Sequence, residues 1–181
     1  MNICLVTPEY FPISGGTGAY VYYLSHYLQK LGHNVHVVAR DKKNSERIFH
    51  GIKVHYIAGT GNALVKFFKF SRSVSKKIKE LNHKIGFDII HANLPLVPSF
   101  AIPDNSSKAI VCAVHSTWKG EALVTKCDNP RKLNPNEKAM LRFNFLLRYF
   151  EKKLMKRSDA LIAVSKYTVN ELTNLYGINK K

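Results

Sequence analysis

The stretch from Asn2 to Arg40, NICLVTPEYFPISGGTGAYVYYLSHYLQKLGHNVHVVAR, decides the fold. Its first apolar run is short and is consistent with a strand buried on both faces. After the turn GGTG, apolar residues recur at the three- and four-residue steps of a helix that rests one stripe on a sheet: Tyr20, Leu24, Tyr27, Leu28 and Leu31. Gly32 ends this helix, and VHVVA suits a second strand. The stretch therefore predicts strand, turn, helix and strand, the opening unit of a parallel α/β sheet.

The rest of the chain continues the same alternation of apolar runs and helical stripes. We expect the following elements, in order: a polar connection DKKNSER, a strand GIKVHYI, a helix from about Leu64 to Ile85, a strand FDIIHAN, a short helix, a strand KAIVCAVHSTW, an irregular loop from Lys119 to Glu137, a helix from about Pro135 to Lys156, a strand SDALIAVS and a helix from Lys166 to Tyr176. No repeat or interdomain linker interrupts them. The sequence predicts an α/β fold, a Rossmann-like doubly wound parallel sheet that forms a single domain over residues 1–181.

The helix expected near residues 135–156 has an unusually broad apolar face. One stripe is formed by Met140, Phe143, Leu147, Phe150 and Leu154, and it is widened by Phe145, Leu146 and Tyr149. Such breadth indicates contacts on more than one side of this helix.

Composition limits the class of protein. The 181 residues, 45% hydrophobic and 22% charged, suit one soluble globular core. Cys4, Cys112 and Cys127 are odd in number and widely spaced, which favours free thiols in a reducing cytoplasm over disulfides or a metal site. We expect no cleaved signal peptide and no membrane span. The formal charge of +16 predicts an anionic partner: nucleic acid, acidic lipid or an acidic sugar.

Candidate site residues follow the predicted strands, where ligands of open parallel sheets bind. They are Gly15, Gly16 and Gly18 after the first strand, His91 and Asn93 after a middle strand, His115 and Ser116 after the next, and Ser165 after the last. The glycines permit positive φ and close approach of a ligand, and N–H groups at a helix N-terminus suit a phosphate, although a tight turn alone also uses glycine. His91 is equally consistent with a structural histidine, and Ser165 is more typical of a helix N-cap than of a catalytic group.

Several sharper motifs are absent. GGTGAY lacks the lysine and hydroxyl residue of a P-loop, and Val21 stands where a G-x-G-x-x-G motif has its third glycine. The second strand also lacks the acid of a dinucleotide site, since Arg40 precedes Asp41 there. There is no G-x-S-x-G, C-x-x-C, H-x-x-x-H or H-E-x-x-H. We expect neither a metal ion nor a bound cofactor.

In their order and spacing, GGTGAYVYYLSHYLQKLGHNVHVV, FDIIHAN, VCAVHSTW and RSDALIAVSKYTVNELTNLYGI resemble the N-terminal domain of a retaining GT-B glycosyltransferase. The resemblance is to the glycogen-synthase-like group, glycosyltransferase family 4, and covers nearly the whole chain. It implies one half of a GT-B architecture, whose N-terminal half binds the acceptor and whose C-terminal half binds the nucleotide sugar. The donor-side E-x-x-x-x-x-x-x-E pattern is absent, so we expect an excised domain or a donor half on a separate polypeptide.

The resemblance also implies roles for individual residues. Gly15 and Gly16 would bring main-chain N–H groups to the donor diphosphate, and His115 would be the catalytic residue that contacts the transferred sugar. Gly18, His91, Asn93, Ser116 and Ser165 would line the cleft or bind the acceptor. Retention in this group is commonly explained by same-face attack in which the leaving phosphate takes the acceptor proton. The implied acceptor is a glycan or a lipid-linked glycan, and an alternative is a non-catalytic subunit of a split transferase that recruits a catalytic partner.

The helix near residues 64–85 is basic and amphipathic. A solvated face is the ordinary explanation for any one of its lysines, but their number favours a surface that rests on anionic lipid, formed by Lys66, Lys69, Arg72, Lys76 and Lys77. We therefore expect a cytoplasmic protein, peripheral at the inner membrane surface. A basic nucleic-acid-binding domain is the less favoured alternative, because the aromatic residues fall on core stripes and do not alternate with the lysine and arginine residues.

Overall fold

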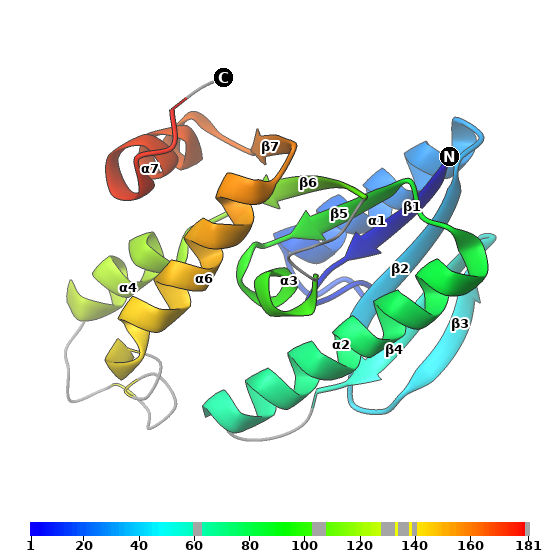
Figure 1. The fold of residues 1–181 in the computed structure, drawn as a ribbon, viewed down its shortest axis with the longest axis horizontal. Helices are drawn as coiled ribbons and strands as arrows, with labels where there is room; N and C mark the ends of the chain where they lie inside the picture. The colour runs from blue at the N-terminus through cyan, green and yellow to red at the C-terminus, as the bar shows by residue number, and fades with distance from the viewer. Residues whose placement is uncertain (60–62, 103–107, 128–132, 134–137, 139–140, 180–181) are drawn as a thin grey trace.

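The computed structural model describes residues 1–59, 63–102, 108–127, 133, 138 and 141–179 (Figure 1). The strands are β1 Asn2–Val6, β2 Asn34–Asp41, β3 Ser45–Phe49, β4 Ile52–Ala58, β5 Ile89–Asn93, β6 Ala109–Val114 and β7 Ala160–Ala163. The helices are α1 Gly16–Lys30, α2 Ala63–Ile85, α3 Leu96–Ala101, α4 Trp118–Cys127, α6 Asn144–Arg157 and α7 Lys166–Tyr176. The sequence predicted most of these elements to within a few residues.

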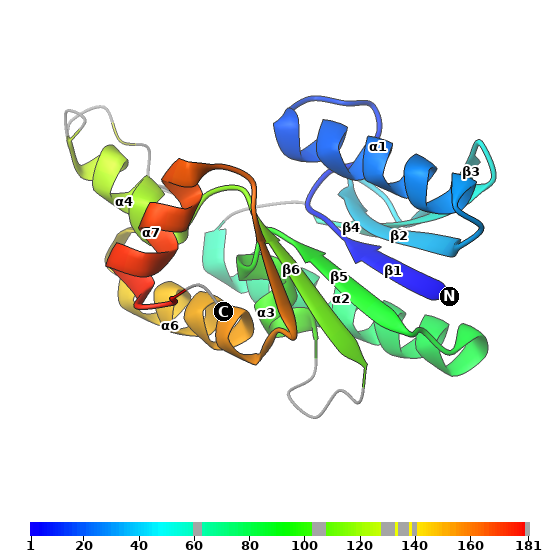
Figure 2. The ribbon, with the colours of Figure 1, turned by 90° about the horizontal axis from the view of Figure 1, so that it is seen from above.

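The seven strands form one sheet in the order β3-β4-β2-β1-β5-β6-β7, in which only β3 runs antiparallel to its neighbour. From β1 the chain winds outward in one direction through β2 and β4, and later in the other through β5, β6 and β7. Figure 2 shows α1 on one face of the sheet and α2, α3 and α6 on the other. The predicted Rossmann-like, doubly wound α/β fold is confirmed.

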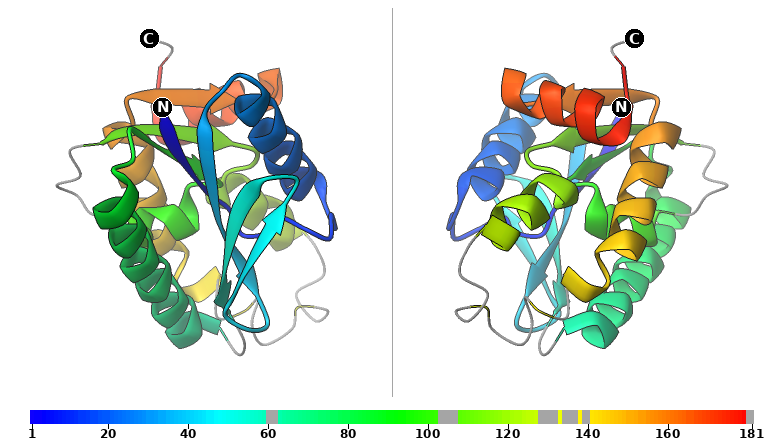
Figure 3. Two further views of the ribbon diagram at one scale, coloured as in Figure 1. Left: turned by 90° about the vertical axis from the view of Figure 1, so that its right-hand side faces the viewer. Right: turned by 90° about the vertical axis from the view of Figure 1, so that its left-hand side faces the viewer.

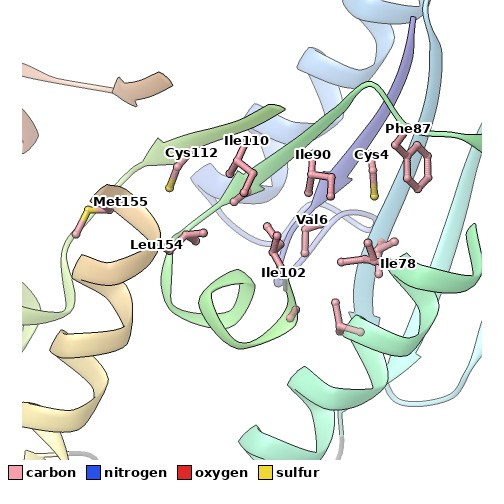
Figure 4. Close-up of a cluster of buried hydrophobic side chains, with 14 of the residues drawn as sticks. Cys4, Val6, Ile78, Phe87, Ile90, Ile102, Ile110, Cys112, Leu154 and Met155 are labelled. Atoms are coloured by element: carbon pink, nitrogen blue, oxygen red, sulfur yellow. The ribbon is translucent and has the colours of Figure 1, made fainter. Parts of the chain in front are cut away.

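The core has two parts because β1 sends alternate side chains to the two faces of the sheet. Cys4 and Val6 belong to the cluster beneath α2, α3 and α6 (Figure 4), and Ile3 and Leu5 belong to the cluster beneath α1. Cys4 and Cys112 are buried free thiols, as predicted. Burial raises the pKa of Cys4 to about 12, so that its thiol stays protonated at neutral pH.

The buried stripe of α1 differs from the predicted one. Tyr27 and Leu31 are 63% and 73% exposed, whereas Val21 and Ser25 are fully buried. The reason is the loop before the helix: it places Tyr10 in the core, where its hydroxyl lies 2.9 Å from Ser25 Oγ. Sequence periodicity could not show this contact, which brings a polar serine to the centre of the buried face.

Two regions predicted as irregular contain regular structure. The polar connection DKKNSER runs into β3, an edge strand whose exposed residues give no apolar alternation. Its hairpin turns at His50 and Gly51, which have φ of 47° and 85°. Part of the loop predicted from Lys119 onward is the helix α4, which begins after Thr117, whose Oγ1 accepts from the Gly120 N–H at 3.0 Å. Residues 128–132 and 134–137 of that predicted loop lie outside the described residues.

The predicted helix near residues 135–156 is described as α6, from Asn144 onward. Leu147 and Leu154 of its predicted stripe are buried, Phe143 is 43% exposed, and Met140 lies outside the described residues. The buried face also takes in Glu151 and Met155. The side chains that widen the predicted stripe, those of Phe145, Leu146 and Tyr149, are exposed within the described chain.

Replacing Ile78 in the middle of α2 by alanine is expected to lower the free energy of unfolding by about 2–5 kcal/mol, because its side chain is 2% exposed and fills the space between helix and sheet. Urea unfolding would measure the change. Lys76→Ala, at an exposed position of the same helix, is the control and should change the free energy of unfolding by less than about 0.5 kcal/mol. Equal effects of the two substitutions would contradict the packing of α2.

Candidate functional site

The carboxyl ends of the parallel strands meet at one edge of the sheet, where the loops after β1, β5, β6 and β7 lie. The registers of β1 with β5 and of β5 with β6 bring Val6 beside Ala92 and Asn93 beside Ala113. The residues that follow these strands are therefore neighbours in space. Every strand-end candidate from the sequence lies at this edge.

The glycine turn is open at one position and covered at two. Gly15 is the extended N-cap of α1, with φ −156° and ψ 177°, and none of Gly15, Gly16 and Gly18 has positive φ. A Cβ placed on Gly16 would meet nothing within 4 Å, whereas one on Gly15 would lie 3.0 Å from Glu9 Oε1. These glycines therefore provide space around the helix N-terminus, and the positive φ that the sequence allowed for is not used.

Glu9 lies beside the N-terminus of α1 and was missed by the sequence reasoning. Ser14 Oγ donates to its carboxylate at 2.5 Å, and the Thr7 hydroxyl donates to its backbone carbonyl at 2.8 Å. Its negative charge is favourable there because the helix dipole is positive at this end and the first turn of α1 has no acid. An anion that binds at Gly15 would therefore meet a carboxylate close by. A lone acid between the first strand and the glycine turn was the available sequence signal.

His91 and Asn93 are buried at the end of β5, with exposures of 6% and 0%. Asn93 Nδ2 donates to the Val6 carbonyl at 3.3 Å, which ties β5 to the end of β1. Within the described part of the chain, His91 Nε2 and Asn93 Oδ1 are buried without a hydrogen-bond partner. Burial, followed by the nearby charge of His115, lowers the pKa of His91 to about 4, so its ring is neutral at pH 7.

His115 follows β6 and packs against α1. Its ring lies edge-on to Tyr20, with ring centroids 4.8 Å apart, and Tyr20 is also 6.4 Å from the ring of His91. Burial lowers the pKa of His115. The sequence placed Tyr20 on the stripe against the sheet, but its ring reaches the strand ends, one helical turn beyond Gly16. The spacing from the glycine turn was the signal for it.

Ser165 is the N-cap of α7, as the sequence favoured. Its Oγ accepts from the Thr168 N–H at 3.1 Å, and the Thr168 hydroxyl donates to the His115 carbonyl at 3.4 Å. Ser165 thus contributes to the edge by fixing the helix that contacts the His115 backbone.

The loop that carries His115 is fixed from two sides. Ser116 Oγ donates to Glu121 Oε1 at 2.5 Å, and the Trp118 N–H donates to Glu151 Oε1 at 3.0 Å. The hydroxyl of Tyr176 donates to the other carboxylate oxygen of Glu151. Glu151 is 2% exposed, and its burial raises its pKa to about 7. A buried carboxyl group of α6 therefore positions the start of α4 and, through it, Ser116.

The basic residues of α2 are divided by the structure. Lys69, Arg72 and Lys76 are exposed and line a hollow of about 610 Å³ together with Lys79. Lys77 is only 18% exposed and pairs with Glu46 at 2.8 Å and Glu80 at 3.4 Å. The prediction that Lys77 forms part of this exposed basic surface is therefore wrong. The side chain of Lys66 lies outside the described structure.

In the described ranges, no group of three or more His, Cys, Asp or Glu residues is placed to hold a metal ion. No helix in the described part of the chain is both long enough and apolar enough to cross a membrane.

The neutral state of His91 has a measurable consequence. Between pH 7 and pH 5 the unfolded chain protonates this histidine while the folded chain does not, so acidification costs about 2 kcal/mol of stability from this residue. His91→Gln should therefore reduce the loss of unfolding free energy over this range by about that amount, whereas His83→Gln, at an exposed position on α2, should not. In an NMR titration, a midpoint for His91 near 6.5 would refute its burial in the neutral form.

Comparison with known proteins identifies the family and supports the fold. A family model described as Glycosyltransferase Family 4 matches residues 14–181. Sucrose-phosphate synthase from Thermosynechococcus elongatus is similar in structure, with a TM-score of 0.74 and 16% identity over 99% of this chain and 46% of that one. Os79 from O. sativa in complex with UDP has a TM-score of 0.56 and 11% identity over 96% of this chain and 49% of its own. The chain thus spans about half the length of these two proteins, and no curated protein matches it.

Proposed function

The chain belongs to glycosyltransferase family 4, and from this premise we propose that it is the acceptor-side half of a retaining GT-B glycosyltransferase. The complete enzyme moves a sugar from a nucleotide-diphosphate sugar to a glycan or lipid-linked acceptor. One observation carries the proposal: a glycine turn that is open at Gly16, and two neutral histidines whose Nε2 atoms have no hydrogen-bond partner within the described residues, converge on one edge of the sheet.

Each part of this edge suits one stage of sugar transfer. The N–H groups at Gly15 and Gly16 lie at the positive end of α1 and can stabilise the negative charge that develops on a diphosphate leaving group. His115 would face the transferred sugar. Its ring packs against Tyr20, and its backbone carbonyl accepts a hydrogen bond from the Thr168 hydroxyl. His91 and Asn93 have buried polar atoms that can bind sugar or acceptor hydroxyl groups. No metal or cofactor is required for these roles.

The partner in this proposal is a donor-binding domain, in the same polypeptide or in a separate subunit, which holds the nucleotide. The length of the chain relative to sucrose-phosphate synthase supports this division. The chain alone should then transfer sugar at a negligible rate. Full sugar transfer by the isolated chain would contradict the division of the enzyme into two halves.

Gly16→Ala tests the diphosphate contact. The added methyl group meets nothing in the chain and alanine favours the helix, so the variant should fold, but the methyl group stands where a phosphate would approach. Titration with pyrophosphate should shift the NMR amide signals of Gly15 and Gly16 in the parent chain. The dissociation constant should rise about tenfold in the variant, a loss of about 1.4 kcal/mol. Asn174→Ala, on the exposed face of α7, is the control, and equal constants for all three proteins would refute the contact.

We also propose that the exposed bases of α2 rest on an anionic membrane, with the protein peripheral at the inner surface. Lys69, Arg72, Lys76 and Lys79 support this by lining one hollow, and no acidic residue occurs in α2 before Glu80.

Lys76→Glu should weaken binding to vesicles of phosphatidylglycerol and phosphatidylcholine about tenfold, since each base near such a surface contributes about 1 kcal/mol and the new charge is repelled. Lys30→Glu, on the opposite face of the sheet, makes the same charge change and should have little effect. Cosedimentation at increasing salt is the measurement, and binding of the parent chain should fall as salt rises. Equal binding to pure phosphatidylcholine vesicles would disprove the electrostatic contact.

A further inference from the structure

The face of α6 that points to solvent combines large apolar side chains with bases. Phe145, Tyr149 and Leu146 are 84%, 57% and 39% exposed. Tyr149 also lines a hollow of about 430 Å³ whose other residues are all basic: Lys152, Lys153, Lys156 and Arg157. The one acid of α6, Glu151, is buried on the opposite side of the helix. Every charge that α6 presents to solvent is therefore positive.

This face continues across α3 to α2. The rings of Phe68, Phe100 and Phe150 are in contact, with centroids 5.0 Å apart between the first pair and 4.2 Å between the second, and Tyr149 lies 5.4 Å from Phe150. A line of aromatic side chains thus runs from the first turns of α2, where Phe68 is 39% exposed, to the first turns of α6. Each helix adds a basic hollow to it. Figures 1 and 3 show the two helices on the same face of the molecule.

The topology places this line beside the candidate site. α2 follows the parallel strand β4, and α6 runs back toward the start of the parallel strand β7, so both helices begin at the carboxyl edge of the sheet. This is the edge that carries Gly16 and His115. A surface that bound the line of aromatic residues would hold the site next to it.

We propose that the exposed face of α6, together with the first half of α2, inserts into the interface of an anionic bilayer, with Phe145 and Tyr149 among the lipid chains and the bases on headgroup phosphates. This inference extends the proposed electrostatic contact of α2, and it rests on that proposal for the identity of the partner, an anionic membrane. Tyrosine favours the membrane interface because its ring is apolar and its hydroxyl can stay in water, and the exposed ring of Phe145 gains from transfer into hydrocarbon. The two basic hollows, one on each helix, complement the charge of phosphate groups.

A single-stranded nucleic acid is the competing ligand, because it also binds surfaces on which aromatic and basic side chains are mixed. The sequence placed the aromatic residues on buried stripes, but on this face Phe145 and Tyr149 are exposed. The aromatic rings of the line, however, pack on one another, which leaves few open ring faces for stacking. Exposed Leu146 cannot stack on a base but gains from contact with hydrocarbon. The combination favours lipid.

The test compares two double variants that each remove two exposed rings. Phe145→Ser with Tyr149→Ser changes α6, and Tyr23→Ser with Tyr27→Ser changes α1, where the rings are 58% and 63% exposed on the opposite face. Cosedimentation with phosphatidylglycerol-containing vesicles at high salt, where surface charges are screened, should show binding by the parent chain and the α1 variant. The α6 variant should bind at least about tenfold more weakly. Circular dichroism melting curves should be alike for all three proteins.

A second measurement reports insertion directly. Tyr149→Trp should gain fluorescence that brominated phosphatidylglycerol quenches, beyond any quenching of the natural Trp118 in the parent chain. Equal vesicle binding of the α6 variant and the parent, or an unquenched tryptophan, overturns the insertion. The electrostatic contact of α2 is tested separately by Lys76→Glu and is not affected by this result. Absence of vesicle binding by the parent chain overturns both. Loss of binding to a single-stranded oligonucleotide by the α6 variant, with vesicle binding unchanged, would assign the face to nucleic acid and also overturn the proposal.

Discussion

The parallel pairing of β1 along both of its edges is the interaction on which the rest of the structure depends. β1 pairs with β2 on one side and with β5 on the other, and its side chains alternate between the two hydrophobic clusters. Asn2 adds hydrogen bonds to Asp88 and to the carbonyls of Ile85 and Gly86, which hold the start of β1 against the end of α2. Removing this strand would separate the sheet into two halves and open both cores.

The candidate site is assembled across that strand. Gly16 and Tyr20 come from the helix that follows β1, whereas His91 and His115 come from strands on its other side. Contact of Tyr20 with His115 therefore joins the two directions in which the chain winds. A site of this kind needs little dedicated structure, because parallel strands that share one direction deliver their ends to the same place.

The sequence was informative where one physical signal dominated. Buried parallel strands are continuous apolar runs, and helix ends are marked by glycine or by a capping residue, so Gly32, Gly86 and Ser165 were placed correctly. The strand ends of the site followed from the same signals. Glu9 and Tyr20 could not be found in this way, because their role depends on how the loop after β1 folds over α1. That conformation is tertiary, and no periodicity records it.

The exposed edge β3 has a consequence for how the chain assembles with other molecules. Unpaired edge strands are templates for intermolecular β-sheet, and proteins guard against this with charged side chains and short strands. β3 carries Glu46 and Arg47, and the opposite edge, β7, spans only the four residues Ala160–Ala163. Neither edge favours extension by a strand from another molecule. Charge on one edge strand and shortness of the other thus disfavour pairing with a strand of another molecule, and contacts with partners are expected from helices and loops.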